Sequence, residues 1–206
     1  MKTYPIMLNV AGRLCVVVGA GPVGMRKAKS LVGAGATVRL VDPDAPDGPR
    51  GRGLECLRRA YDPSLLAGAT LVFACTDDAH LNARIAADAR SAGALVNVAD
   101  DPDHCDFFTA AVAEDGNVVV AVGTGGASPA LAASLKEKLS ACLPERVGEF
   151  AAALRHARRH VHQRTPDAER RRHVLGKLAG EIGYKAFLEG GVEGLMRLAE
   201  TALEES

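Results

Sequence analysis

Three glycines with the spacing G-x-G-x-x-G follow directly on a run of valines near the start of the chain. They are Gly19, Gly21 and Gly24, with Pro22 and Val23 between the last two. Between a strand and a helix, the first glycine permits a tight turn and the second lets the backbone approach a pyrophosphate. The third lets the helix pack closely against the strand. Because the first N–H groups of a helix attract phosphate, this segment predicts binding of a dinucleotide cofactor.

An acidic residue stands where a ribose-binding carboxylate is expected. Asp42 ends the next apolar run about 20 residues after the glycines. Its carboxylate would accept hydrogen bonds from the adenosine ribose and would repel a 2′-phosphate, which favours NAD over NADP. The alternative is that Asp42, followed by Pro43, only begins a turn.

Polar residues also follow the apolar run at 71–75. Ligands of open parallel sheets bind outside the carboxyl ends of the strands, so Thr76 and Asp77 are expected to border the cofactor. Helix capping by Asp77 or Asp78 is the alternative, and it is compatible with a place beside the cofactor.

A third polar cluster follows the run at 95–98. A carboxylate held beside a nicotinamide and partly desolvated can act as a general base, because burial and neighbouring carboxylates raise its pKa. An acidic turn stiffened by Pro102 is the alternative. One adjacent His–Cys pair lacks the spacing of a zinc site, so no metal site is predicted. The cluster contains Asp100, Asp101, Asp103, His104, Cys105 and Asp106.

A second glycine-rich loop leads from the run at 118–122 into a helix. Ser128 stands before Pro129, an arrangement typical of a helix N-cap. The exposed N–H groups of this loop could hold an anion such as a substrate carboxylate, which makes Thr124, Gly125 and Ser128 candidate substrate-binding residues. A tight connection without a ligand is the alternative.

The spacing of apolar runs predicts the elements that carry these loops. Valine-rich strands separated by helical patterns at 25–32 and 81–90 indicate a parallel sheet covered on both faces, hence an α/β, Rossmann-type domain. The Pro- and Gly-rich stretch 43–53 is expected to be a loop. After Pro144 helical periodicity takes over, with a helix expected to start at Thr165–Asp167 and a break at Gly190 and Gly191. The predicted strands are 14–18, 38–41, 71–75, 95–98 and 118–122.

Composition narrows the class of protein. The 206 residues suffice for one or two domains, and 25 basic against 25 acidic side chains argue against nucleic-acid binding. The longest uncharged stretch, 116–135, contains four glycines and a proline, so no membrane segment is expected. Five widely spaced cysteines and no export signal predict reduced thiols in the cytoplasm.

Four motifs in register resemble the precorrin-2 dehydrogenase and sirohydrochlorin ferrochelatase family, which also forms the N-terminal part of siroheme synthases. The resemblance implies NAD-dependent oxidation of precorrin-2 to sirohydrochlorin, and in some members insertion of Fe²⁺ into that product. It extends from Tyr4 to about Pro144. The matching motifs are Gly19–Lys27, Cys75–Asp78 with Asn82, Asn97–Pro102 and Thr124–Ala132.

The resemblance also assigns roles and parts. It implies that Asp100 is the catalytic residue and that the protein is a homodimer. The expected parts are an NAD-binding domain at 1–113, a dimerisation segment at 114–145 and a helical domain at 146–206. A tetrapyrrole carries many carboxylates, so a basic cleft is expected, with a solvated helix face as the alternative. Its candidates are Arg26, Lys27, Lys29, Arg155, Arg158, Arg159 and Arg164.

A binding protein that senses NAD without turnover is the main rival interpretation. It requires the glycine fingerprint and Asp42 but not Asp100, so substitution of Asp100 separates it from an enzyme.

Overall fold

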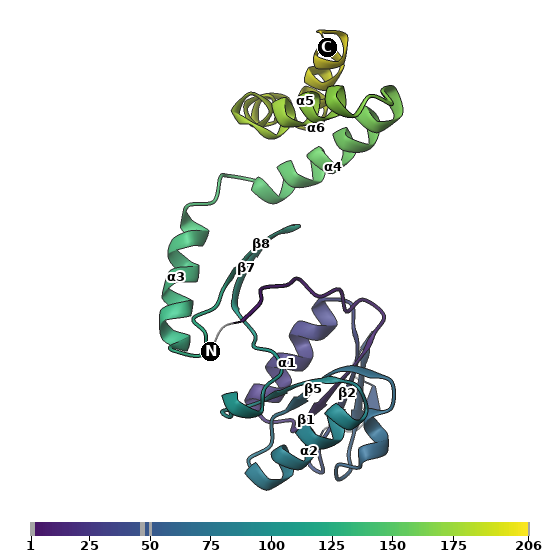
Figure 1. Ribbon diagram of the computed structural model, residues 1–206, viewed down its shortest axis with the longest axis vertical. Coiled ribbons are helices and arrows are strands. Elements are labelled where there is room, and N and C mark those ends of the chain that lie inside the picture. The colour runs from purple at the N-terminus through teal and green to yellow at the C-terminus, as the bar shows by residue number, and fades with distance from the viewer. Residues whose placement is uncertain (1–2, 46–47, 50, 206) are drawn as a thin grey trace. The chain divides into compact units, whose positions relative to one another are not determined.

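The computed structural model describes residues 3–45, 48–49 and 51–205 (Figure 1). The chain forms two compact units, Met1–Thr109 and Ala110–Ser206, and each has its own core. The first unit contains the predicted cofactor residues and Asp100, and the second contains the glycine-rich loop at 124–128.

A six-stranded sheet forms the centre of the first unit, and its strand order is β3-β4-β2-β1-β5-β6. All neighbouring strands pair in parallel except β3 with β4. The chain builds the sheet outward from β1 on one side and then returns to add β5 and β6 on the other. The strand order reverses between β1 and β5, and open sheets of this type bind their ligands at the carboxyl ends of the strands beside such a reversal. The strand order confirms the Rossmann-type prediction. The strands are β1 (Leu14–Val18), β2 (Thr37–Val41), β3 (Gly48–Pro49), β4 (Leu54–Leu57), β5 (Ala69–Ala74) and β6 (Leu95–Val98).

Helices cover both faces of this sheet. Val16 and Val18 pack with α2 on one face, whereas Cys15 and Val17 pack with α1 on the other. Because side chains alternate along a strand and both faces are covered, β1 reads as an unbroken apolar run. The helical elements of this unit are α1 (Pro22–Gly33), η1 (Pro63–Leu66), α2 (Ala79–Ser91) and η2 (Pro102–His104).

Several strands differ from the sequence prediction. The stretch 43–53, predicted to be a loop, contains the two-residue strand β3, and β7 (Ala111–Asp115) was not expected. The short strand β4 was not expected; its four residues alternate, with Glu55 exposed. The run at 118–122 does not join the parallel sheet, because β8 (Val118–Val122) pairs antiparallel with β7. The two residues between these strands can close a hairpin but are too few for a parallel crossover.

The second unit combines this hairpin with four helices. α3 (Pro129–Ala141) packs on the hairpin, and α4 (Val147–Arg164), α5 (Ala168–Ala179) and α6 (Glu181–Glu205) enclose a separate apolar core. The predicted break is confirmed at Gly191, where α6 bends with φ 58° and ψ −147°.

Helix α5 begins at the end of the stretch Thr165–Asp167 where a helix start was predicted. Asp167 is the N-cap, and its carboxylate accepts hydrogen bonds from the N–H groups of Glu169 and Arg170. Thr165 is buried and ends α4 instead. A carboxylate at the N-cap satisfies two N–H groups of the first turn and interacts favourably with the helix dipole.

Among the described helices, none combines the length and the apolar character needed to cross a lipid bilayer. All five cysteines are free thiols, of which Cys15 and Cys56 are buried.

Candidate functional site

The glycine fingerprint forms the turn between β1 and α1. Gly19 has φ +101°, and a Cβ atom there would lie 2.4 Å from the carbonyl oxygen of Cys75. A Cβ on Gly24 would lie 1.9 Å from the carbonyl oxygen of Gly19. No side chain larger than hydrogen fits at either position without movement of the backbone, so these two glycines shape the turn and its contact with β5.

Gly21 differs from its two neighbours because its missing side chain leaves open space. No heavy atom lies within 4 Å of the position a Cβ would take. Gly21 is also the N-cap of α1, a helix start that has no side-chain cap hydrogen bond and carries Pro22 in its first turn. N–H groups at a helix start beside open space can bind an anion such as a pyrophosphate.

Asp42 ties the end of β2 to this turn. One carboxylate oxygen accepts a 2.6 Å hydrogen bond from the Ala20 N–H, and the other accepts a 2.7 Å bond from the Asp44 N–H. Asp42 therefore does shape a turn, while a carboxylate retains further lone pairs for ribose hydroxyls. Arg39, the nearby cation, is bound to Glu55 at 3.2 Å and to the carbonyl oxygen of Leu65 at 2.8 Å.

The loop after β5 is fixed by Asn82, a residue the site prediction left out. Its buried amide accepts from the Thr76 hydroxyl at 2.7 Å and donates to the Thr76 carbonyl at 2.9 Å. Asp78 caps α2 through the N–H groups of His80 and Leu81, as the alternative interpretation expects. Thr76 and Asp78 thus hold the loop, and the neighbouring Asp77 is exposed.

Cys75 lies between the glycine turn and this loop. Burial is the largest cause that raises the pKa of its thiol, to about 11, while nearby cations act in the opposite direction. The thiol is therefore protonated at neutral pH and adds no charge beside the cofactor turn.

Asp100 leaves the carboxyl end of β6 in a left-handed conformation, with φ +60°. This conformation is uncommon for a residue other than glycine and is found preferentially at functional sites. The preceding N–H, of Ala99, donates to the carbonyl oxygen of Ala74 at 2.9 Å and keeps the turn beside β5. Within the described part of the chain the Asp100 carboxylate is exposed and makes no hydrogen bond or ion pair, so it is accessible to a ligand.

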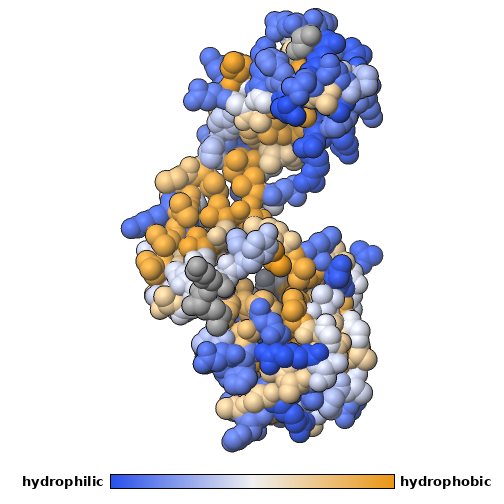
Figure 2. Space-filling model, in the orientation of Figure 1, coloured by the Kyte–Doolittle hydropathy of each residue, from blue (hydrophilic) through white to orange (hydrophobic). Residues whose placement is uncertain are grey.

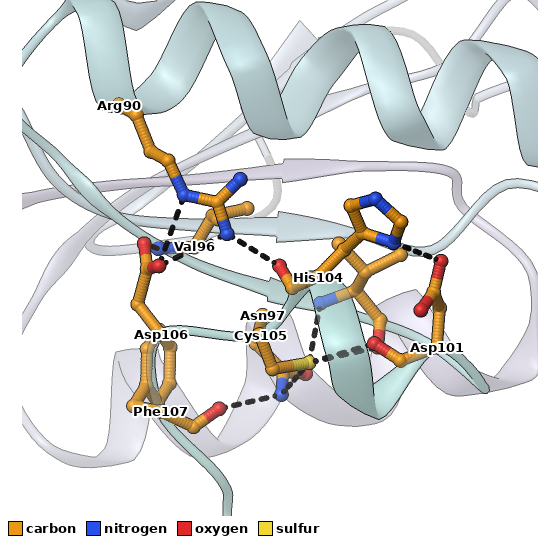
Figure 3. Close-up of polar contacts among 9 residues, drawn as sticks. Arg90, Val96, Asn97, Asp101, His104, Cys105, Asp106 and Phe107 are labelled. Carbon is orange, nitrogen blue, oxygen red and sulfur yellow. Dashed lines mark hydrogen bonds and ion pairs between the residues drawn. The ribbon is translucent and has the colours of Figure 1, made fainter.

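The segment after Asp100 folds back along the edge strand β6 (Figure 3). Asp106 binds both backbone groups of Val96, with its N–H on the carbonyl oxygen at 2.8 Å and its carboxylate on the N–H at 3.0 Å. From α2, Arg90 donates to Asp106 at 3.0 Å and to the carbonyl oxygen of His104 at 2.9 Å. His104 also contacts Asp101 at 2.7 Å. Asp101, His104 and Asp106 therefore support the loop, and Asp100 and Asp103 are exposed.

Lys27, on α1, is half-buried, unlike its basic neighbours Arg26 and Lys29. Its Nζ donates to the Thr109 hydroxyl at 2.5 Å and lies 5.6 Å from the centre of the Phe73 ring. Burial is the main cause that lowers its pKa. The sequence grouped Lys27 with Arg26 and Lys29 because nothing in the helical pattern separates a half-buried lysine from its exposed neighbours.

The glycine-rich loop of the second unit is closed by its own side chains. The Thr124 hydroxyl donates to the carbonyl oxygen of Ser128 at 3.1 Å and accepts from its N–H at 3.2 Å. The Ser128 hydroxyl accepts from the Leu131 N–H at 3.1 Å, which confirms the predicted N-cap of α3. Gly125 has φ +61°. Thr124, Gly125 and Ser128 all lie in the second unit, whereas the other predicted site residues lie in the first.

Basic side chains of the helical core differ in their partners. Arg164 pairs with Glu200 at 3.3 Å, whereas Arg159 and His156 line an open hollow together with Arg146 and Phe187. In the described part of the chain, no three His, Cys, Asp or Glu side chains are grouped so as to hold a metal ion.

The fold and the glycine turn together define a dinucleotide-binding protein of the Rossmann type. The family model described as "Putative NAD(P)-binding" matches residues 6–111, just over half of the chain. The chain belongs to this family.

Relatives with curated descriptions agree with the resemblance found in the motifs. The siroheme synthase of Chromobacterium violaceum is 39% identical over 177 residues, which are 84% of this chain and 37% of that protein. The siroheme synthase of Methylococcus capsulatus is 36% identical over 213 residues, which cover 100% of this chain and 45% of the relative. The chain thus spans about two fifths of the length of these relatives.

A solved structure described as "SirC, precorrin-2 dehydrogenase" has the same fold. It matches with a TM-score of 0.72 and 21% sequence identity, covering 99% of this chain and 100% of that one. The fold of this chain therefore has a counterpart along its whole length.

Proposed function

We propose that this chain is an NAD-dependent precorrin-2 dehydrogenase that produces sirohydrochlorin in siroheme synthesis. The observation that carries the proposal is that the open space at Gly21 and the exposed carboxylate of Asp100 both follow the carboxyl ends of parallel strands, β1 and β6, in one sheet. The names of the siroheme synthase relatives and of the SirC structure support tetrapyrrole chemistry for that crevice.

The residues of the first unit divide the reaction between them. Gly19, Gly21 and Gly24 form the turn for the pyrophosphate, and Asp42 favours NAD by meeting the ribose hydroxyls. NAD, when bound, supplies the hydride acceptor. Precorrin-2 loses a hydride, which carries one proton and two electrons, to NAD. It loses a second proton to the carboxylate of Asp100.

The neighbouring loop residues complete the proposed cofactor site. Pro22 and Val23 line the start of α1, and Thr76 and Asp77 follow β5 at the same edge of the sheet. In the second unit, we assign Thr124, Gly125 and Ser128 to a substrate carboxylate. This assignment is supported by the glycine backbone, because backbone N–H groups in such loops bind anions.

We further propose a homodimer formed through residues 114–145. The exposed apolar residues of α3 recur every four positions, as Leu131, Leu135 and Leu139, and Val112 and Val119 are exposed on the hairpin. Figure 2 shows hydrophobic residues gathered over α3 and β7–β8. Monomeric proteins rarely expose a large contiguous patch of this kind, and sedimentation equilibrium tests the proposed association.

With 114–145 as the dimerisation segment, we propose that the chain divides into three parts, 1–113, 114–145 and 146–206. The division is supported by the second unit's core, which draws its buried members from α4, α5 and α6. The free cysteines are compatible with the reducing cytoplasm as the place of action.

Insertion of Fe²⁺ into sirohydrochlorin is a second proposed activity. It is supported by the name of the relatives, siroheme synthase, since siroheme is the iron-containing product. Here Fe²⁺ is a substrate of the reaction.

The decisive experiment compares the wild type with Asp100→Ala and Asp100→Asn. Purified protein is supplied with precorrin-2 and NAD, the visible spectrum is followed, and Fe²⁺ is then added. We expect a loss of kcat of roughly 100-fold or more in both variants, because general base catalysis contributes about that much, with NAD affinity retained. An NAD sensor without turnover would keep its cellular function after Asp100→Ala, and that result would refute the enzyme proposal.

A further inference from the structure

The thiol of Cys105 lies at the centre of the loop that carries Asp100 (Figure 3). Its sulfur accepts from the Val98 N–H at 3.2 Å and from the side-chain amide of Asn97 at 3.4 Å. The same sulfur lies 3.3 Å from the carbonyl oxygen of Val98 and 3.2 Å from that of Asp101. One side chain thus contacts the backbone both before and after Asp100.

The turn at Asp100 needs such support because its backbone is strained. A left-handed φ is unfavourable for a residue with a side chain, and it persists only where the surroundings hold it. Ala99 is held on the incoming side by the carbonyl oxygen of Ala74. On the outgoing side the Asp101 carbonyl oxygen faces the thiol of Cys105.

The hydrogen of the thiol is what makes this contact favourable. A thiol has one hydrogen to donate, and both nearby carbonyl oxygens are acceptors. Burial is the main cause that raises the pKa of Cys105, so the thiol keeps its hydrogen at neutral pH. A thiolate would instead face two carbonyl oxygens with no hydrogen to share.

Asn97 connects the sulfur to the core of the unit. Its side chain is buried and also donates to the carbonyl oxygen of Phe107 at 2.9 Å. The rings of Phe107 and of Phe73, on β5, pack in a T-shaped arrangement, with 5.3 Å between ring centres and nearly perpendicular planes. The sulfur is therefore linked through Asn97 to the backbone of Phe107, whose ring packs on the sheet.

We propose that Cys105 is a positioning residue of the dehydrogenase, which holds the Asp100 turn and so keeps that carboxylate at the cofactor crevice. The inference rests on the proposed function, because it assumes that Asp100 is the base. Cys105 itself touches neither substrate nor cofactor in this account.

The first test compares Cys105→Ala and Cys105→Ser with Cys56→Ala, a matched control. Cys56 is buried in β4, so its replacement lowers stability without touching the Asp100 turn. We expect Cys105→Ala to lower kcat by roughly tenfold or more, because a displacement of about 1 Å costs up to 100-fold, with KM and the Kd for NAD within about twofold. The serine hydroxyl also donates and accepts, so Cys105→Ser restores part of kcat. Cys56→Ala leaves kcat unchanged below its unfolding transition.

The second test is a double-mutant cycle with Asp100→Ala. If Cys105 acts through Asp100, the double variant turns over at the rate of Asp100→Ala alone, within about twofold. Losses that multiply, or an unchanged kcat in Cys105→Ala, overturn the inference while the proposed function stands. If Asp100→Ala keeps the wild-type rate, the proposed function fails and the inference fails with it. Should Cys105→Ala not fold, the cycle is run with Cys105→Ser under the same criteria.

Discussion

Two loops meet the predicted crevice of the first unit, and they are held in place by different means. The turn after β1 is shaped by the absence of side chains, since a Cβ at Gly19 or Gly24 would overlap backbone atoms. The loop after β6 is shaped by hydrogen bonds that the side chains of Arg90 and Cys105 donate and that the Asp106 carboxylate accepts. The first kind of turn leaves a readable glycine pattern in the sequence, and the second kind leaves only a cluster of polar residues.

The largest expected effect is on the free energy of unfolding, and it differs between Gly24 and Gly21 in the first loop. Gly24→Ala places a methyl group 1.9 Å from a carbonyl oxygen, so we expect a loss of about 3 kcal/mol or more of unfolding free energy, or no folded protein. Gly21→Ala meets no neighbour, so its stability should stay within about 0.5 kcal/mol of the wild type. Urea unfolding measures both changes.

The Gly21→Ala variant also tests the proposed cofactor cradle. The methyl group of Gly21→Ala would stand where we propose that the pyrophosphate binds, so NAD affinity should fall by roughly tenfold or more, as measured by calorimetric titration. Wild-type affinity in Gly21→Ala would mean that this turn does not hold the cofactor.

An intermediate effect is expected in the second loop. Asp106→Ala removes the acceptor for the Val96 N–H and the partner of Arg90, at a cost of about 1–3 kcal/mol in unfolding free energy. Amide hydrogen exchange at Val96 should become faster. The control is Asp103→Ala, which removes an exposed carboxylate and should change stability by less than about 0.5 kcal/mol. Equal stability of the two variants would contradict a loop held by hydrogen bonds.

The smallest expected effect is on the pH dependence of stability, and it involves α2, the helix that carries Arg90. Asp88, also on α2, accepts a 2.9 Å hydrogen bond from the Tyr61 hydroxyl, and burial followed by this bond raises the pKa of Tyr61 well above its usual value. Above about pH 10 the unfolded chain loses the phenolic proton that the folded chain keeps, so stability falls as pH rises.

Substitution of the phenol isolates this contribution. Tyr61→Phe should weaken the fall in stability between pH 9 and 11, measured by urea midpoints of variant and wild type in parallel. The effect is small because Tyr61 is part-exposed and water screens the carboxylate. Identical pH profiles would mean that the Asp88 contact does not link α2 to its surroundings.

The comparison also explains how much of the structure the sequence predicted. The glycine turn and the buried strands β1, β2, β5 and β6 were predicted. The turn requires glycine and a strand buried on both faces requires apolar residues, so residue type alone indicates both features. The bend at Gly191 was predicted for the same local reason. The roles of the predicted cofactor, catalytic and substrate residues stay predictions.

Other features depend on where distant segments return, which residue type does not encode. The pairing of β8 with β7 follows from a two-residue link that an apolar run alone does not reveal. The support of Asp100 by Cys105, and of Thr76 by Asn82, requires a loop or helix to fold back onto a strand end. Such side chains look like ordinary polar or core residues until the fold brings them together.

The hydrogen bond from the Ala20 N–H to Asp42 limits how this protein can be re-engineered. Replacement of the ribose-facing acid by a small or basic residue is the usual way to make such a domain accept NADP. In this chain the same replacement would leave a backbone N–H of the phosphate turn without its acceptor. In the proposed cofactor site, cofactor choice and turn geometry are therefore coupled at Asp42, and a change of preference would need a compensating acceptor for the Ala20 N–H.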